Sequence, residues 1–334
     1  MTAEIARALW LEPPRHADVR AEILPTPGID DLVIKTRYSA VSRGTETLVY
    51  AGDVPESEYG RMRAPFQAGT LPGAVKHGYA NVGVVERGPG DWPGRSVFCL
   101  YPHQTRYVVP RDAVVPLPPR VPARRAVLAA NMETAVNALW DAAPRVGDRI
   151  TVVGAGVLGS LVAGLCAGLP GGDVELVDID ADRAAVASAL GVAFTRPETA
   201  SSGRDVVFHA STSSDGLNTA LSLAGPEAEI VELSWFGTHA ASVALGGAFH
   251  SQRLTLKASQ VGTVSPARSA RWSHRRRLAL ALDLCADARF DVLFAEDADF
   301  ESLPAVMARL ADPADRTLCQ RIVYANHQDS SCTT

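Results

Sequence analysis

Short apolar runs separated by glycine and proline characterise the first third of the chain. Four such runs, at residues 32–35, 83–86, 96–98 and 106–109, have the length and composition of β-strands. Their close spacing is typical of a strand-rich, barrel-like domain. We place this domain at residues 1–122.

The pattern changes after Pro122, where a longer alanine-rich segment begins. Residues 123–139 predict a helix, and from Arg149 onward apolar strands alternate with helical segments. Such alternation predicts a parallel sheet with helices on its faces. We place this second domain at residues 123–295. Its predicted strands cover residues 149–153, 174–178, 206–210 and 230–233, and its later helices begin near Ala181, Ser214 and His274.

The last part of the chain has a third pattern, a helix followed by one strand. Residues 303–310 predict the helix and residues 319–324 predict the strand. We expect this strand to return to the first domain, so that residues 296–334 form a C-terminal extension of that domain. The predicted fold class is therefore α/β, with a β-barrel domain and a doubly wound domain built on a parallel sheet.

A glycine-rich turn follows the first strand of the second domain. Gly154, Gly156 and Gly159 have the G-x-G-x-x-G spacing of the Rossmann dinucleotide site. The first glycine allows the tight turn, the second lets the backbone approach a pyrophosphate, and the third lets the helix pack closely on the strand. The phosphates would bind free N–H groups at the start of the helix, at Val157 and Leu158. The sequence therefore predicts a dinucleotide cofactor.

A carboxylate stands at the end of the next strand. Asp178 lies 24 residues after Gly154, where an acidic residue binds the ribose hydroxyls of NAD. Its negative charge would repel the 2′-phosphate of NADP, so the sequence favours NAD over NADP. Arg183 could soften that preference by meeting a phosphate. Alternatively, Asp178 is a solvated carboxylate beside Asp180 and Asp182.

Composition and charge exclude several classes of partner. The 334 residues carry a net charge of −5 and the pI is about 5.9, which argues against nucleic acid and acidic membrane surfaces. The longest apolar run, residues 158–169, is shorter than the roughly 20 residues that span a membrane. Residues 1–20 contain charges and prolines where a secretory signal would be apolar. We expect a cytoplasmic protein whose partner is a small-molecule substrate.

The cysteines are spread singly along the chain, without a C-x-x-C pair or a short metal-ligand spacing. This pattern is typical of a reducing compartment. We expect each cysteine to be a small buried or surface residue and not a catalytic nucleophile. The five are Cys99, Cys166, Cys285, Cys319 and Cys332.

Together with the glycine motif, several landmarks make the chain resemble the medium-chain dehydrogenase/reductase superfamily over nearly its whole length. Its members pair an N-terminal GroES-like barrel with a Rossmann domain. Within the zinc-type alcohol dehydrogenase-like group, the chain is most similar to the bacteriochlorophyllide dehydrogenase-like and sorbitol dehydrogenase-like branches. The resemblance implies an oxidoreductase that forms a homodimer through its Rossmann sheets, and the apolar residues 243–245 could serve as the contact. The landmarks are Arg43-Gly44-Thr45-Glu46, residues 78–85, Met132-Glu133-Thr134-Ala135 and Val146-Gly147-Asp148.

Most of the metal ligands of the zinc-dependent relatives are absent. By resemblance, Arg43 replaces a ligand cysteine, and Tyr79 and Ala80 replace a His-Glu pair. Glu133 alone remains as an acidic ligand, and one carboxylate does not make a zinc site. The structural zinc lobe with its four cysteines is absent as well. The sequence predicts an enzyme without zinc. The alternative is a site rebuilt from His77, Glu46, Glu133 or His103.

Without a metal, hydrogen-bond donors or a cation must stabilise the oxyanion that hydride transfer creates. Arg43 could polarise a carbonyl or bind a substrate carboxylate, and could instead pair with Glu46 or Glu133. By resemblance, Thr45 matches the hydroxyl residue that relays the substrate proton. Tyr79 could donate its phenolic proton as a general acid. Alternatively, Thr45 caps a helix and Tyr79 packs against the sheet.

Two further segments bear on substrate recognition. By resemblance, His103 and Gln104 lie where family members line the substrate pocket, although the segment could be a simple turn between strands. Residues 268–277 are rich in arginine around Trp272. Such a run is usually a solvated helix face, and binding of an anionic substrate group is the alternative.

These observations predict an NAD(H)-dependent, zinc-independent oxidoreductase that interconverts a secondary alcohol and a carbonyl on a polar or cyclic metabolite. Two alternatives stay open. The first is reduction of an activated C=C bond on the same scaffold, a reaction whose enzymes commonly prefer NADPH, so that Asp178 counts against it. The second is a nucleotide-binding protein without turnover, which would also have lost the zinc ligands.

Overall fold

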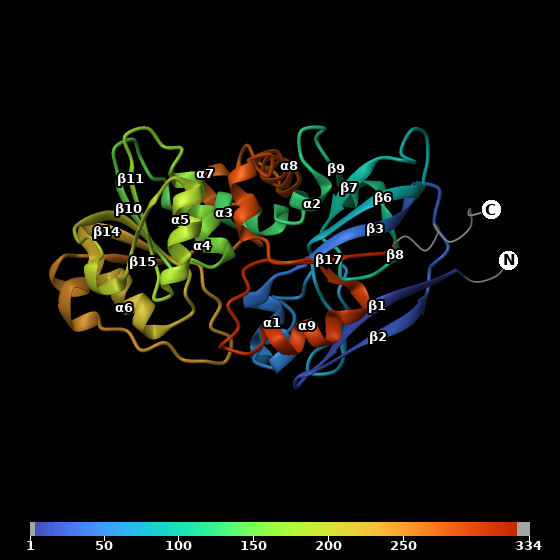
Figure 1. Cartoon of the computed structure of the whole chain (residues 1–334), viewed down its shortest axis with the longest axis horizontal. Coiled ribbons are helices and arrows are strands. Elements are labelled where there is room, and N and C mark those ends of the chain that lie inside the picture. The colour runs from blue at the N-terminus through green and yellow to red at the C-terminus, as the bar shows by residue number, and fades with distance from the viewer. Residues whose placement is uncertain (1–3, 326–334) are drawn as a thin grey trace. The chain divides into compact units, whose positions relative to one another are not determined.

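The structure is a computed structural model that describes residues 4–325 (Figure 1). The chain divides into two compact units. Unit 1 comprises residues 1–129 and 294–334, and unit 2 comprises residues 130–293. The sequence boundaries at 122/123 and 295/296 lie close to these divisions. The difference at the first boundary arises because the helix α2 (Ala123–Ala126) packs with the barrel strands of unit 1.

Unit 1 is built from two sheets. Its strands are β1 (Ile5–Glu12), β2 (His16–Ile23), β3 (Asp31–Val41), β4 (Ala68–Gly69), β5 (Val75–Lys76), β6 (Asn81–Arg87), β7 (Ser96–Cys99), β8 (Arg106–Pro110), β9 (Val114–Pro116), β16 (Ala298–Asp299) and β17 (Gln320–Val323). One sheet has the order β2-β1-β5-β4, and the other has the order β16-β17-β3-β6-β7-β9 with β8 also paired to β3. Because β17 runs antiparallel to β3, the C-terminal strand does return to the first unit.

Within residues 4–325, three helices of unit 1 cover its sheets. They are α1 (Arg43–Ala51), α2 and α9 (Leu303–Leu310), and short 3-10 turns lie at Glu56–Glu58, Arg111–Ala113 and Phe300–Ser302. The helix α1 ends at Gly52, whose φ of +83° places it in the left-handed conformation that commonly closes a helix. The helix α9 packs against α1 and β2. The two segments of unit 1 therefore share one core.

Unit 2 contains a parallel sheet with the order β12-β11-β10-β13-β14-β15. Its strands, in chain order, are β10 (Arg149–Val153), β11 (Asp173–Val177), β12 (Ala193–Thr195), β13 (Arg204–His209), β14 (Ala224–Glu232) and β15 (Thr255–Ala258). The strand order reverses between β10 and β13, which confirms the doubly wound fold. The outer strands β12 and β15 were not predicted. Most of their residues are exposed or half-buried, so no apolar run marks them.

The helices of unit 2 lie against this sheet and at its ends (Figure 1). They are α3 (Ala129–Ala142), α4 (Val157–Cys166), α5 (Ala184–Leu190), α6 (Ser214–Leu223), α7 (Pro266–Ser269) and α8 (His274–Leu284), with short 3-10 or π turns at Ala181–Arg183, Pro197–Thr199, Leu245–Phe249 and Ala288–Leu293. The single helix predicted over residues 123–139 is two helices. The N–H of Leu128 bonds to the carbonyl of Arg125, a tighter 3-10 step that separates them.

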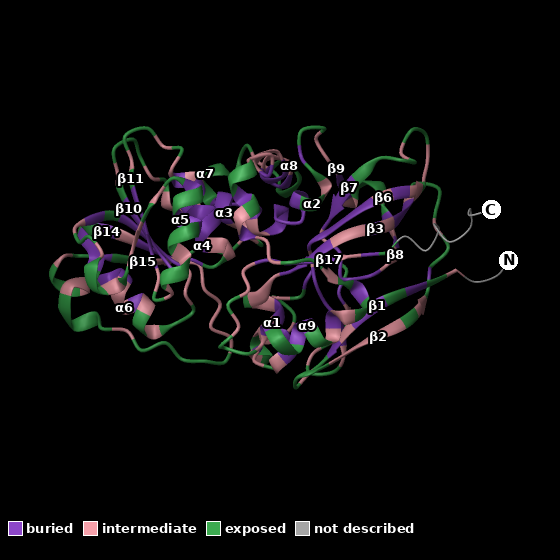
Figure 2. Cartoon of the chain, viewed as in Figure 1, coloured by how far each residue is buried: buried purple, intermediate pink, exposed green. Residues whose placement is uncertain are grey.

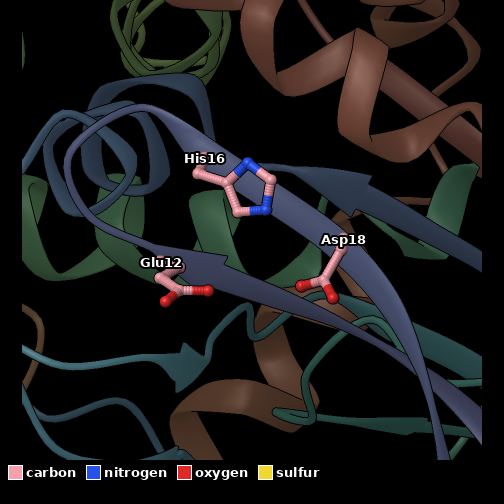
Figure 3. Close-up of side chains that lie close together, drawn as sticks. All are labelled: Glu12, His16 and Asp18. Atoms are coloured by element: carbon pink, nitrogen blue, oxygen red, sulfur yellow. The ribbon is translucent and has the colours of Figure 1, made fainter.

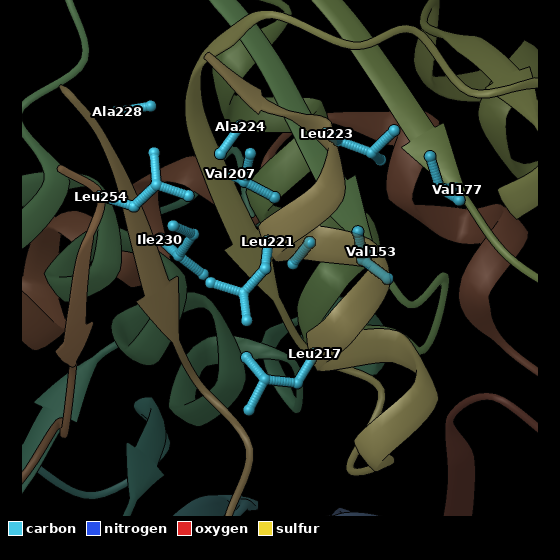
Figure 4. Close-up of a cluster of buried hydrophobic side chains, with 11 residues drawn as sticks. Val153, Val177, Val207, Leu217, Leu221, Leu223, Ala224, Ala228, Ile230 and Leu254 are labelled. Carbon is cyan, nitrogen blue, oxygen red and sulfur yellow. The ribbon is translucent and has the colours of Figure 1, made fainter. Parts of the chain in front are cut away.

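Buried side chains concentrate along the strands of each unit, and the outer helix faces are exposed (Figure 2). In unit 2, Val153, Val207 and Ile230 from three neighbouring strands pack against Leu217 and Leu221 of α6 (Figure 4). This cluster anchors α6 beside the carboxyl ends of β10, β13 and β14.

The apolar run at residues 243–245 does not form one continuous surface. Val243 packs against the core cluster of unit 2, whereas Leu245 is 48% exposed. The homodimer contact at this run stays a prediction. Within residues 4–325, no helix combines the length and the apolar character that crossing a membrane requires.

Candidate functional site

The glycine turn of unit 2 has the backbone geometry that its sequence predicts. Gly154 has a φ of +106°, and a Cβ at this residue would lie 2.8 Å from the backbone of Ala210. A Cβ on Gly159 would lie 1.9 Å from the carbonyl oxygen of Gly154. A Cβ on Gly156 would meet no atom within 4 Å. The first and third glycines are therefore required by packing, and the second leaves an open backbone surface.

The helix α4 begins directly at this open surface. Its first intrahelical bond runs from the N–H of Ser160 to the carbonyl of Gly156. Helix geometry leaves the N–H groups of Val157, Leu158 and Gly159 without an acceptor inside the helix. These groups and the helix dipole favour an anion such as a pyrophosphate.

Asp178 follows β11 and faces the same turn. One carboxylate oxygen accepts a hydrogen bond from the N–H of Ala155 at 2.7 Å, and the other accepts from the N–H of Asp180 at 2.8 Å. Each oxygen has a further lone pair for a ribose hydroxyl. Arg183 lies 3.3 Å from the Asp180 carboxylate, and both side chains are largely buried. The glycine turn, the helix start and Asp178 thus fit the dinucleotide that the sequence predicts.

Glu133 lies in a buried ion pair of unit 2. Its Oε1 accepts a hydrogen bond from Nε of Arg277 at 3.0 Å, and both side chains are almost fully buried. Burial raises the pKa of Glu133, although Arg277 acts in the opposite direction. Arg277 also donates to Asn137 and to backbone carbonyls. Sequence reasoning missed this pair because 144 positions separate its members and Arg277 stands in a run of exposed arginines.

The rest of the arginine-rich segment is exposed. Arg276 stacks on Trp272 with its guanidinium 3.9 Å from the ring centroid. Trp272 contacts Trp140 at 4.8 Å between centroids, and Arg268 lies over the other side of this pair. These contacts are those of a solvated helix face, on which arginine side chains cover the tryptophan rings and keep their charged ends in water.

Glu46 is the buried centre of a hydrogen-bonded chain in unit 1. Its Oε2 lies 2.9 Å from Nε2 of His103, and Nδ1 of His103 lies 2.7 Å from Oγ of Ser39. The same Oγ lies 2.9 Å from the hydroxyl of Tyr324. The other oxygen of Glu46 accepts from the N–H of Ser42. Burial acts to raise the pKa of Glu46, but His103 and the hydrogen bond from Ser42 outweigh it and lower that pKa.

His77 and Tyr79 lie beside this chain. Burial lowers the pKa of His77 to about 4, against the opposing charge of Glu46, and its Nδ1 has no partner among the described residues. Burial and the charge of Glu46 raise the pKa of Tyr79 to about 12, whereas hydrogen bonds with Ser42 and Thr45 act in the opposite direction. The structure therefore brings together Thr45, Tyr79, His77, Glu46 and His103 in one part of unit 1.

The Arg43 side chain binds backbone carbonyls of the C-terminal segment. Its guanidinium donates hydrogen bonds to the carbonyls of Leu310, Asp312 and Thr317, which follow or end α9. These contacts connect the start of α1 to the C-terminal segment of unit 1. Cationic side chains stabilise the carbonyls at a helix end, so Arg43 has a clear structural role.

Gln104 is buried, and both ends of its amide bind other protein groups. Its Oε1 accepts from Nζ of Lys76 at 2.7 Å, and its Nε2 donates to the carbonyl of Arg106 at 2.7 Å. Lys76 in turn lies 2.6 Å from the carboxylate of Glu22. Of the two residues that the sequence assigned to substrate recognition, His103 belongs to the Glu46 chain and Gln104 to this separate cluster.

Among the residues that the structure describes, the donor groups around Glu46 do not fit a zinc ion as they are arranged. Zinc needs three or four N, S or O ligands around one point. Both nitrogens of His103 and both oxygens of Glu46 bind other protein groups. Of the imidazole nitrogens of His77 and His103, Nδ1 of His77 is buried and has no hydrogen-bond partner among the described residues. The residues at positions 43, 79 and 80 supply no ligand of the usual type.

A group of three possible metal ligands lies elsewhere among residues 4–325. Glu12, His16 and Asp18 face one another on the hairpin of β1 and β2 (Figure 3). Arg20 lies 2.9 Å from the Glu12 carboxylate and 3.0 Å from that of Asp18. Arg20 forms an ion pair with each of the two carboxylates, and acidic groups near the surface commonly cluster in this way without a metal.

The described cysteines are all buried, and none of them forms a disulfide. Burial raises the pKa of Cys166 and of Cys319 to about 12, and it raises that of Cys99 further. A thiol with a raised pKa is a poor nucleophile. Cys332 lies outside the described residues.

No protein-family model and no curated protein matches the chain. Solved structures do share its fold over nearly the whole length. L-idonate 5-dehydrogenase from Escherichia coli has a TM-score of 0.77 at 12% identity, with 96% of this chain and 99% of that chain covered. A protein from Sinorhizobium meliloti bound to NADP has a TM-score of 0.75 at 17% identity. An alcohol dehydrogenase from Escherichia coli complexed with NADH has a TM-score of 0.72 at 16% identity.

Both of the latter structures cover 96% of this chain and are themselves covered over 99% of their length. At such low identity the likeness concerns the fold, and one of the two structures holds NADP while the other holds NADH. The strand order of unit 2, the glycine turn and the returning β17 agree with that likeness. The chain therefore has the fold of the medium-chain dehydrogenase/reductase superfamily, with a barrel unit and a Rossmann unit.

Proposed function

We propose that this protein is an NAD(H)-dependent oxidoreductase that interconverts a secondary alcohol and a carbonyl on a polar or cyclic metabolite without zinc. The observation that carries the proposal is the open backbone surface at Gly156, between the start of α4 and the carboxylate of Asp178. A bound nicotinamide cofactor supplies the hydride acceptor or donor. The backbone of the glycine turn holds the pyrophosphate, and Asp178 holds the adenosine ribose.

The charge of Asp178 supports NAD over NADP. Its carboxylate is held in place by two backbone N–H groups, so it cannot swing away from a 2′-phosphate without losing both bonds. Arg183 is paired with Asp180 at 3.3 Å. That pairing reduces its capacity to neutralise a phosphate, which favours NAD further.

The polar groups of unit 1 support chemistry without a metal. A phenol whose pKa is raised to about 12 stays protonated, so Tyr79 can donate a hydrogen bond to an oxygen that gains negative charge. Thr45 supports it by hydrogen bonding to the same phenol. The hydrogen bond between Glu46 and His103 fixes the orientation of the His103 ring, which also bonds to the Ser39 hydroxyl. We assign Tyr79 and Thr45 to the substrate oxygen and Arg43 to the positioning of α1.

The first prediction concerns Asp178→Ala. Loss of a hydrogen bond to a charged group costs about 1.5–3 kcal/mol, so the Kd of NADH should rise roughly tenfold to a hundredfold. The Kd of NADPH should change less, because the repulsion of its phosphate is removed as well. Fluorescence titration with both nucleotides measures this, with Asp182→Ala, an exposed neighbour, as the control. An unchanged NADH to NADPH ratio would contradict the ribose assignment, and failure of the unaltered protein to bind either nucleotide would overturn the proposed function.

The second prediction concerns Tyr79→Phe. If the phenol donates to the substrate oxygen, turnover should fall about a hundredfold or more, while the Kd of NADH stays the same. A screen of secondary alcohols and ketones with NAD or NADH supplies the substrate for this assay. Tyr59→Phe, at a half-buried tyrosine of the same unit, is the matched control. Normal turnover in Tyr79→Phe would leave this tyrosine with a packing role only.

The third prediction concerns the pH dependence of stability. The unfolded chain protonates His77 near pH 6.5, and the folded chain does so only near pH 4. The contribution of this neutral histidine is therefore complete above pH 6.5 and is lost as the pH falls toward 4, by about 3 kcal/mol. Urea unfolding at pH 7 and pH 4.5 should show a smaller loss of stability for His77→Gln than for the unaltered protein. His16→Gln, on the exposed hairpin, should behave as the unaltered protein does, and equal pH slopes for all three proteins would refute this account.

A further inference from the structure

A second chain of hydrogen bonds, at the carboxyl ends of β13 and β14, takes no part in the function proposed above. Glu232 ends β14, and its Oε2 lies 2.6 Å from Nδ1 of His209. Nε2 of His209 lies 2.7 Å from Oγ of Ser211, and this Oγ lies 3.0 Å from Oγ of Ser213. The ring of His209 is fully buried and the side chain of Glu232 is 15% exposed. The chain thus leads from a largely buried carboxylate and imidazole pair to the half-buried hydroxyl of Ser211.

This chain lies at the point where the strand order reverses. His209 pairs with Val153 of β10 on one side and with Glu232 on the other. A Cβ on Gly154 would lie 2.8 Å from the backbone nitrogen of Ser211, so Ser211 adjoins the glycine turn directly. Dinucleotides bind across this crevice in doubly wound sheets. Since Asp178, after β11, takes the adenosine side, the nicotinamide side must lie over β13 and β14.

The partners of His209 determine how the Ser211 hydroxyl is oriented. The Glu232 carboxylate is an acceptor and places a proton on Nδ1, and its other oxygen accepts from the N–H of Ser234 at 2.7 Å. In the neutral ring Nε2 is then an acceptor. Ser211 therefore donates its one proton to His209. Its oxygen remains able to accept a hydrogen bond from a ligand hydroxyl.

The backbone around Ser211 is held in an unusual conformation. Thr212 has a φ of +55°, which is uncommon for a residue other than glycine, and its N–H donates to Oγ of Ser234 at 3.0 Å. A Cβ on Gly216 would lie 2.0 Å from Oγ of Ser211, so the first turn of α6 must be glycine there for the hydroxyl to keep this position. Such strain is found at ligand-binding turns.

We propose that Ser211, oriented by His209 and Glu232, accepts a hydrogen bond from a hydroxyl of the ribose on the nicotinamide side of the dinucleotide. Ser211 contacts the cofactor, and His209 and Glu232 are positioning residues. The proposal rests on the proposed function, because it requires a dinucleotide in the crevice. It adds a contact that neither the glycine motif nor Asp178 supplies.

Three nucleotides of increasing length test this contact without any enzyme assay. ADP contains the adenosine half only, ADP-ribose adds the second ribose, and NADH adds the nicotinamide. For Ser211→Ala we expect the Kd of ADP-ribose and of NADH to rise about three- to tenfold, as for one lost neutral hydrogen bond, and the Kd of ADP to stay within twofold. Calorimetry or fluorescence titration measures all three.

Further variants separate positioning from folding. His209→Leu should raise the Kd of ADP-ribose and of NADH without changing the Kd of ADP, as Ser211→Ala does. His209→Gln, whose amide offers both a donor and an acceptor, should restore part of that affinity. Ser222→Ala, on the exposed face of α6 with only a local hydrogen bond, is the control and should bind all three nucleotides normally.

Each outcome bears on one proposal or the other. If Ser211→Ala raises the Kd of ADP and of ADP-ribose equally, or leaves the Kd of NADH unchanged, the ribose contact is overturned. The proposed function is left intact by either result. Absence of NADH binding by the unaltered protein overturns the proposed function itself. Failure of His209→Gln to regain affinity beyond His209→Leu refutes the orienting role of His209.

Discussion

The buried, hydrogen-bonded pair of Glu46 and His103 organises the polar interior of unit 1. A carboxylate removed from water is costly unless partners satisfy it, and removal of one member of such a pair costs about 3–5 kcal/mol. Both oxygens of Glu46 are satisfied, one by His103 and one by the N–H of Ser42. His103 in turn fixes Ser39, and Ser39 contacts Tyr324 of the returning C-terminal segment. One carboxylate thereby links the start of α1 to strands distant in sequence.

The same solution recurs in unit 2. Glu232 and His209 form a carboxylate and imidazole pair at the ends of two parallel strands, and Glu133 is neutralised by Arg277. These three largely buried carboxylates therefore each have a named partner. In unit 2, the N–H groups at the start of α4 have no acceptor inside the helix. Such N–H groups and the helix dipole favour an anion.

Local patterns in the sequence were enough to predict the parallel sheet, its glycine turn and the returning C-terminal strand. These features depend on residues close together in the chain, such as Gly154, Gly156 and Gly159. The division between α2 and α3 and the edge strand β15 were missed, because a single 3-10 step and an exposed strand leave no apolar pattern. The sequence also identified Glu46 and His103 as notable but gave no sign that they pair. Contacts between residues 57 positions apart depend on how the sheets close, which periodicity does not report.

The central claim is that the polar groups of unit 1 bind one another in place of a metal. The most direct test is the metal content, by plasma mass spectrometry, of protein purified without chelator or added metal. The account predicts well under one zinc per chain in protein that binds NADH, because His103 and Glu46 have no free ligand atom in this arrangement. About one zinc per chain would contradict it, and would mean that His77, His103 and Glu46 rearrange to hold the ion.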